Sequence, residues 1–159
     1  MIDVATDADM ATCLQLELGG VGTFLEILQA EQGALVEGEV ERLEGMASDK
    51  ARMAEQLSAL AARRSRYLAS HGFSTDIQGM AGWLAHSADA KTVSAWRVLQ
   101  ELTATAQQLN RTNGIIIAAR LRHNQQALAA LQGAAGAISL YGPNGQTLGP
   151  GGGRASLRV

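Results

Sequence analysis

The chain has 159 residues, a formal net charge of −2, a single cysteine and an aromatic content of only 4%. This length fits one domain, and the lone Cys13, expected as a small core residue, excludes an intramolecular disulfide and a multi-cysteine metal site. Because the 47% of hydrophobic residues are mostly aliphatic, the composition favours narrow helix–helix contacts over a large ligand cavity.

Both prolines, Pro143 and Pro150, lie in the last part of the sequence. Proline inside a helix costs about 3 kcal/mol because it lacks a backbone donor, so the residues before it can form long helices. The predicted fold is all-α: an elongated antiparallel helical bundle or hairpin of long coiled-coil-like helices over residues 1–135. Residues 136–159, with both prolines and a run of glycines, predict a flexible C-terminal tail.

A first helix is predicted after an N-cap at Asp7 or Asp9. Its apolar residues recur at spacings of four and three, as in the seam of a coiled coil: Leu14, Leu18, Val21, Leu25 and Leu28. Glycines at 19, 20 and 22 weaken this helix. They predict a bend, a close helix contact or a break.

A second helix is predicted from Ala34 to Ser70, with a heptad seam in which Lys50 and Arg64 are the basic interruptions. We expect these two side chains to lay their stems on the core and to carry their charges outward. Such side chains fit a role in fixing the register between helices as well as a role in binding a partner. Gly72 then predicts a left-handed helix cap.

A short helix over residues 77–86 and a long one complete the predicted bundle. The short helix carries Met80, Trp83 and Leu84, which predict a lid across the ends of the longer helices. The long helix starts after an N-cap at Ser87 or Asp89 and ends near residue 133. Its apolar seam slips by one residue near residue 117 and is interrupted by two asparagines, at 113 and 124, which predict control of register or partner choice.

The small net charge hides an asymmetry between the two parts of the chain. Residues 1–49 contain eleven acidic residues and one basic residue, whereas residues 50–159 contain four acidic and twelve basic residues. We therefore expect four acidic side chains of the first part to lie beside basic residues of a later helix. These four are Glu37, Glu39, Glu41 and Glu44. Nucleic-acid binding is not expected, because no aromatic residues alternate with Arg63, Arg64 and Arg66.

The residues show no pattern typical of catalysis or of a metal site. His71, His86 and His123 have no partner at metal-ligand spacing, and no serine or cysteine lies in a nucleophile motif. We therefore expect a binding protein, not an enzyme, with no cofactor. The N-terminal residues lack the pattern of a signal peptide, and we expect no 18-residue apolar run that spans a membrane or inserts stably in one. The predicted location is therefore the cytoplasm.

Two stretches carry a more specific pattern. Residues 109–116 read Leu-Asn-Arg-Thr-Asn-Gly-Ile-Ile, and residues 140–146 read Leu-Tyr-Gly-Pro-Asn-Gly-Gln. Earlier positions add a leucine pair followed by glutamate, lysine and arginine along one helix: Leu28, Glu31, Ala34, Leu35, Leu43, Ala47, Lys50, Leu57 and Arg64. Over about residues 24–146 the chain resembles the FlgN family of flagellar export chaperones.

The resemblance implies a cytoplasmic chaperone of the flagellar type III export system. It would bind the C-terminal helices of hook-filament junction (hook-associated) proteins, prevent their premature assembly and deliver them to the export gate. The residues expected in substrate-protein binding are Asn113, Ile116, Ile117, Leu121, Asn124, Leu128 and Leu131. Tyr141 matches a tyrosine that the family uses for export-gate docking.

The same helical pattern also fits a self-assembling structural or secreted helical-hairpin subunit. Such a subunit would lengthen into filaments as its concentration rises, whereas a chaperone would stay small and bind a foreign helix. Coiled-coil-like seams are compatible with a homodimer as well.

Overall fold

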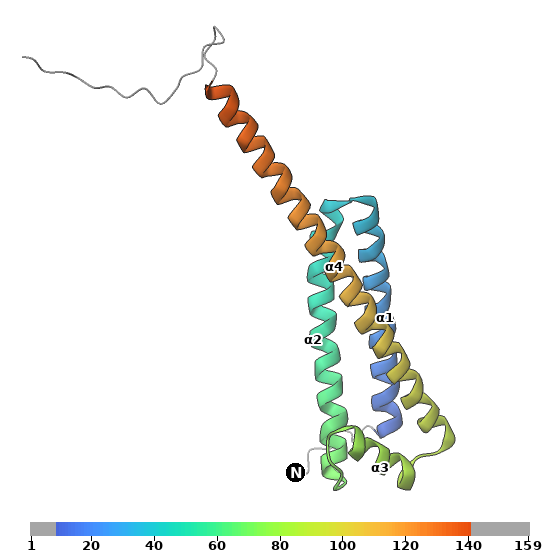
Figure 1. Cartoon of the computed structure of the whole chain (residues 1–159). Coiled ribbons are helices and arrows are strands. Elements are labelled where there is room, and N and C mark those ends of the chain that lie inside the picture. Colours follow the sequence, from blue (N-terminus) through green and yellow to red (C-terminus); the bar gives the residue numbers. More distant parts are fainter. Residues whose placement is uncertain (1–8, 141–159) are drawn as a thin grey trace, which may run out of the picture. The chain divides into compact units, whose positions relative to one another are not determined.

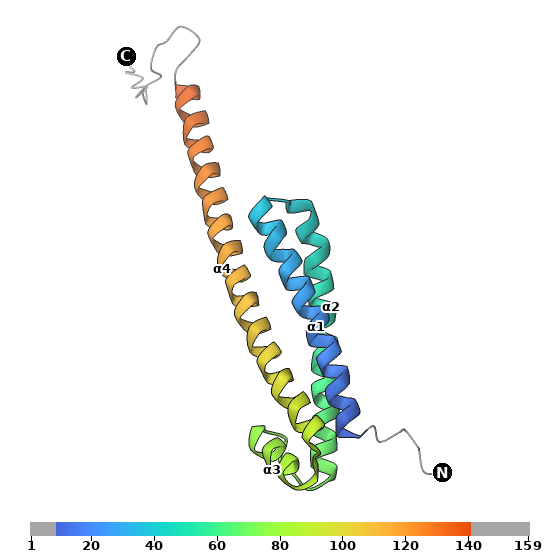
Figure 2. The same cartoon turned by 90° about the vertical axis from the view of Figure 1, so that its right-hand side faces the viewer.

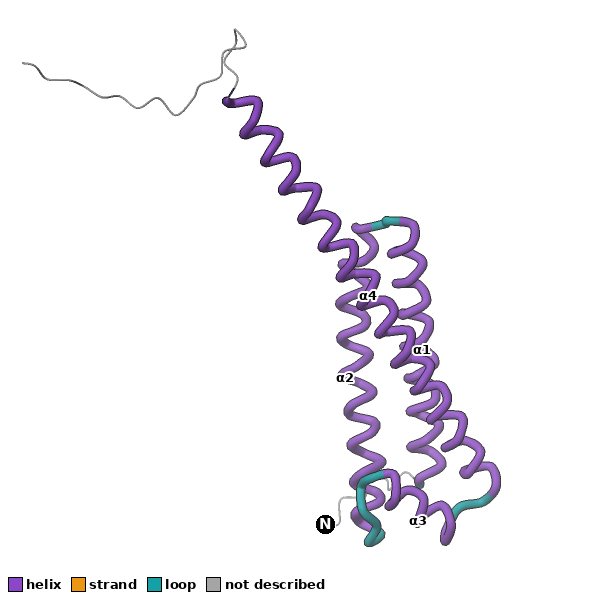
Figure 3. Tube along the Cα trace, viewed as in Figure 1, coloured by secondary structure: helices purple, strands orange, loops and turns teal. Residues whose placement is uncertain are grey.

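The computed structural model describes the backbone of residues 9–140 and the side chains of residues 9–86 and 88–136. It contains four helices in chain order: α1 (Met10–Glu37), α2 (Val40–Ser70), α3 (Ile77–Ser87) and α4 (Ala90–Leu140). Short loops join them, and residues 9–140 contain no strand (Figure 3). The all-α prediction is confirmed, whereas the coiled-coil geometry stays a prediction.

The chain divides into two compact units within α4, between Ile116 and Ile117. Unit 1, up to Ile116, contains α1, α2, α3 and the first part of α4. Unit 2 begins at Ile117 and contains the rest of α4. The predicted division into a bundle at residues 1–135 and a tail at 136–159 stays a prediction, because residues 141–159 lie outside the described part of the chain.

Three helices begin with an aspartate as N-cap, and two of these resolve a choice that the sequence left open. Of the candidates considered, Asp9 caps α1 and Asp89 caps α4, while Asp76 caps α3. Each carboxylate accepts a hydrogen bond of 2.8 Å from the backbone N–H three residues later. Hydrogen bonds from side-chain hydroxyls and from backbone N–H groups lower the pKa of all three carboxyls.

The first interhelical turn lies later in the chain than the sequence predicted. α1 continues through Glu37, and Gly38 ends it in the left-handed conformation with a φ of 77° while its N–H bonds to the Ala34 carbonyl. The prediction that a second helix starts at Ala34 is therefore wrong, since α2 starts at Val40. Val36, expected on the seam of that second helix, belongs to α1 and is 71% exposed.

The other helix ends agree with the predictions except at the C-terminal end of α4. α2 ends at Ser70, and Gly72 has the expected positive φ of 78°. α4 runs to Leu140 instead of ending near Gly133. Alanine is the strongest helix former, so the alanines that alternate with glycine over residues 133–137 offset the cost of about 1 kcal/mol per glycine.

Gly20 lets α1 and α2 approach closely, and none of the three glycines at 19, 20 and 22 breaks α1. A Cβ atom on Gly20 would lie 2.8 Å from Cδ2 of Leu57 and 3.3 Å from Cε of Met53. Figures 1 and 2 show α1 and α2 side by side, running in opposite directions. Of the three outcomes that the glycines allowed, the structure thus has the close helix contact.

The core of unit 1 is an aliphatic cluster closed at one end by α3. Leu14 and Leu28 of α1 and Leu68 of α2 are fully buried. Met80 of α3 is fully buried too, and Trp83 is 7% exposed. Both belong to the same cluster, so these two residues do cover the end of the longer helices as predicted.

α1 contains a stretch long and apolar enough to cross a membrane, with a mean hydropathy of 1.2 over 18 residues. This differs from the expectation that no such run exists, because leucine, isoleucine, valine and phenylalanine outnumber the charged residues along this helix. In the structure, Leu14, Leu28 and Leu35 of this helix are at most 1% exposed. Its Glu17 and Glu31 are also buried. In this structure, α1 therefore contributes one face to the core of unit 1.

The close contact at Gly20 predicts a position-specific effect of a larger side chain. We expect Gly20→Leu to lower the free energy of unfolding by about 1–3 kcal/mol, because the new side chain must displace Leu57. The matched control is Gly19→Leu, which has nothing within 4 Å of its Cβ position and should gain up to about 1 kcal/mol from helix propensity. Urea unfolding followed by circular dichroism measures both, and equal effects would contradict the close contact.

Candidate functional site

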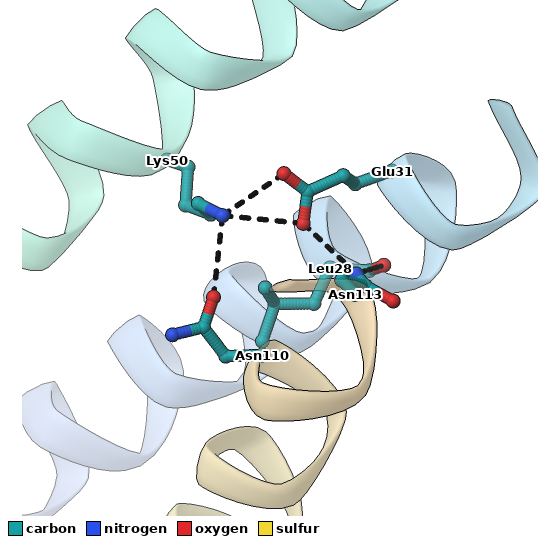
Figure 4. Close-up of polar contacts among 5 residues, drawn as sticks. All are labelled: Leu28, Glu31, Lys50, Asn110 and Asn113. Carbon is teal, nitrogen blue, oxygen red and sulfur yellow. Dashed lines mark hydrogen bonds and ion pairs between the residues drawn. The ribbon is translucent and has the colours of Figure 1, made fainter. Parts of the chain in front are cut away.

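A buried carboxylate joins three helices of unit 1 (Figure 4). Glu31 of α1 is 4% exposed. Its carboxylate oxygens accept hydrogen bonds of 2.9 and 3.2 Å from Nζ of Lys50 on α2. Nδ2 of Asn113 on α4 donates to the same carboxylate at 2.8 Å and to the Leu28 carbonyl at 2.9 Å. Nζ of Lys50 also donates to Oδ1 of Asn110 at 3.2 Å.

This arrangement is stabilising only as a complete set. Taking a carboxylate out of water costs several kcal/mol, which a cation and further donors must offset. Lys50 supplies the cation and Asn113 supplies the neutral donor, so removing either leaves Glu31 undersatisfied. The cluster of Glu31, Lys50, Asn110 and Asn113, which we call the polar anchor, therefore sets how this part of α4 lies on α1 and α2.

A second ion pair, between Glu17 and Arg64, links α1 and α2. Nε of Arg64 donates to Oε1 of Glu17 at 2.7 Å, and Nη2 of Arg64 lies 3.4 Å from Oε2. The Arg64 guanidinium also lies over the ring of Trp96, 4.9 Å from its centroid. Glu17 and Glu31 are two heptads apart on α1, and Lys50 and Arg64 are two heptads apart on α2. Both pairs thus obey one antiparallel alignment.

These ion pairs correct two predictions from the sequence. Lys50 and Arg64 carry their charges to buried carboxylates, not outward. The acidic partners are Glu17 and Glu31, not the four glutamates expected between residues 37 and 44, of which Glu39, the residue before α2, pairs with Arg42 in the first turn of α2. The signal that could have found them is the equal two-heptad spacing of acids on one helix and bases on the next.

An open groove of about 400 Å³ lies beside the second pair in unit 1. Glu17 and Arg64 line it together with Leu57, Trp96 and Leu99. Its volume is at the lower end of the range typical of ligand pockets. The prediction that the chain has no large cavity therefore needs this qualification, although the groove is open and mainly apolar.

Cys13 lies in the core of unit 1, as predicted, and is 2% exposed. Burial raises the pKa of its thiol, which disfavours the thiolate that a nucleophile needs. Among the described residues, no group of three histidine, cysteine, aspartate or glutamate side chains is placed to hold a metal ion.

The residues predicted to bind a substrate protein divide between the two units. Asn113 is fully buried in the polar anchor, and Ile116 is half-buried. In unit 2, Ile117 is 42% exposed and the leucines are 56–68% exposed. The exposed members are Ile117, Leu121, Asn124, Leu128 and Leu131, and Tyr141 lies outside the described residues.

The five exposed positions follow one another at spacings of four, three, four and three residues. On an α-helix this spacing places them on one face, which we call the exposed seam. The buried positions of α4 in unit 1 include Leu99, Ala106 and Asn113, and continuing their spacing leads to Arg120, not Leu121. The exposed seam is therefore shifted by one residue from the seven-residue spacing of the buried positions, a shift that offsets the drift of about 20° per heptad on a straight α-helix.

Comparison with known proteins agrees with the pattern read from the residues. Over residues 1–149, the chain matches the family model described as FlgN protein. No curated protein and no solved structure shows a significant match to the chain.

The polar anchor predicts a large cost for removing its cation alone. We expect Lys50→Met to lower the free energy of unfolding by about 3 kcal/mol, because Glu31 is left as a buried, unpaired carboxylate. The combined change E31Q/K50M should recover part of this loss, since no buried charge remains. Urea unfolding of the two variants measures the difference.

The matched control for this prediction is Arg42→Met, at a pair with Glu39 whose side chains are 55% and 38% exposed. Removing a cation from such an exposed pair should cost far less, because solvent screens the charges. If K50M is no more destabilising than R42M, the buried carboxylate does not control the packing of these helices.

Proposed function

Because this chain belongs to the FlgN family of flagellar export chaperones, we propose that its exposed seam binds the C-terminal helices of hook-associated proteins. The family is one of chaperones, not of enzymes. The observation that supports this proposal most is the row of large apolar side chains left exposed on unit 2. An apolar stripe on a helix normally faces a partner.

The seam has the form that helix-to-helix recognition requires. Apolar anchors spaced by three and four residues are the mode by which an amphipathic helix packs against another helix or into a groove. Burying one leucine side chain contributes about 1.5–3 kcal/mol. The four apolar positions of the exposed seam can therefore supply enough free energy for stable binding after the entropic cost of association.

Binding in this way would mask the client. The C-terminal helices of hook-associated proteins would otherwise expose an apolar face that pairs with neighbouring subunits. A chaperone helix on that face keeps it from water and from other subunits, so premature assembly is prevented until export. A second copy of this chain is the competing occupant of the same seam, which is how a homodimer would form.

Delivery is the second part of the proposal. We assign export-gate docking to Tyr141, which directly follows α4 in the chain, and we place the protein in the cytoplasm. This arrangement gives client binding to residues 117–131 and docking to the segment that follows. The two steps should therefore be separable by mutation.

Client binding predicts a defined effect of shortening the seam. We expect L121A/L128A to weaken binding of the C-terminal segment of a hook-associated protein at least tenfold, because two apolar anchors are lost. Isothermal titration calorimetry measures the Kd. The matched control is V93A/V98A, which shortens two exposed valines of α4 in unit 1 and should leave the Kd unchanged.

The variant Tyr141→Ala should bind the client segment with the same Kd as the unchanged protein. The amount of client exported by cells that carry this variant should fall, because docking at the export gate is lost. Absence of saturable binding by the unchanged protein would overturn the proposed function. Growth of filaments with rising concentration would instead support the self-assembling subunit.

A further inference from the structure

One polar residue, Asn124, lies in the middle of the exposed seam. Two apolar side chains precede it along the seam and two follow it. The side chain of Asn124 is exposed, so its amide leaves water only when a partner helix packs on the seam. An amide that leaves water without gaining hydrogen bonds is unfavourable. The residue that the partner places opposite Asn124 therefore affects which helix binds.

Asn113, an earlier residue of α4, shows how this chain accommodates a buried asparagine (Figure 4). Asn124 follows Asn113 by eleven residues, which is about three turns of an α-helix, so both lie on nearly the same face of α4. Asn113 is fully buried. Its Nδ2 donates to the Leu28 carbonyl at 2.9 Å and to the Glu31 carboxylate at 2.8 Å. A facing helix, α1, thus supplies the hydrogen-bond acceptors that a buried asparagine requires.

A carboxylate is a costly acceptor in such a place. Glu31 is buried together with a cation, since Nζ of Lys50 on a third helix lies 2.9 Å from its Oε1. A carboxylate also has no proton to donate, and within the described part of the chain no group donates to Oδ1 of Asn113. A side-chain amide needs no cation, and it can donate to Oδ1 and accept from Nδ2 of the same asparagine. An amide therefore suits Asn124 better than a carboxylate does.

We propose that the exposed seam selects an amphipathic helix that carries asparagine or glutamine in the middle of its apolar face, at the position that meets Asn124. This inference rests on the proposed function and names the chemistry of the client. A single asparagine in a coiled-coil seam fixes register and partner choice at some expense in stability. The apolar residues on either side of Asn124 would accept a client shifted by one heptad, whereas an amide pair allows one register only.

The test is a calorimetric titration with the C-terminal segment of a hook-associated protein in three forms. The first form is natural, the second has each Asn and Gln of its apolar face changed to Leu, and the third has them changed to Asp and Glu. The unchanged protein should bind the natural form about tenfold more tightly than either other form. The reason is that only an amide gives Asn124 both hydrogen bonds without burying a charge.

The variant Asn124→Leu should reverse the preference between the natural and the leucine form. The client amide then lacks a hydrogen-bond partner, whereas a client leucine gains an apolar one. The matched control is Gln126→Leu, which adds the same side chain about 200° further around the helix, away from the seam. Its Kd for each form should stay within about threefold of the unchanged protein's value. Circular dichroism checks that all variants keep their helix content.

Each outcome decides between two claims. A preference for the natural form that N124L reverses and Q126L retains supports the inference. If the natural segment binds but N124L and Q126L choose alike among the forms, or if the acidic form binds as tightly as the natural one, the inference is overturned and the proposed function stands. Both are overturned if the natural segment does not bind the unchanged protein, and a dimer of the protein alone would then identify a second copy as the occupant.

Discussion

The buried carboxylate of Glu31 is the interaction on which the arrangement of unit 1 depends. A carboxylate that is 4% exposed needs a cation and further donors. Lys50 of α2 and Asn113 of α4 meet this need from two directions, so three helices share one point of contact. Aliphatic side chains alone would tolerate sliding by a turn, because leucine contacts resemble one another at each step of a seam. The polar anchor allows one register only.

This constraint separates the two parts of α4. Up to Ile116 the helix is held by the polar anchor and by aliphatic contacts such as Leu99 and Ala106. Beyond it, the large apolar side chains are exposed. One continuous helix thus serves two purposes: its first part completes unit 1, and its second part presents the exposed seam. The exposed seam uses other residues than those that hold α4 to α1 and α2, so a client can bind to it without competing for those contacts.

The sequence predicted the helices well because their signals are local. Aspartate caps, Gly72 and the absence of proline before residue 143 depend on nearby residues alone, and the slip of the α4 seam is visible in the spacing of its apolar side chains. Interhelical pairing was harder to predict. The sequence predicts that Lys50 points outward. It does not show that Glu31 is buried and needs a cation, because that burial depends on tertiary packing. The predicted start of the second helix at Ala34 is too early, because Gly33 directly precedes it and fits a helix end as well as Gly38 does, and only packing distinguishes the two glycines.

The central claim is that the two parts of α4 have different partners, and amide hydrogen exchange along this helix tests it most directly. Exchange rates report how often each part opens. We expect slow exchange over residues 99–116 with or without a client segment, and exchange over residues 117–136 that becomes slow only when a hook-associated C-terminal segment is added. Protection that appears instead on α1 and α2, or residues 117–136 already protected and unchanged by the segment, would contradict this account.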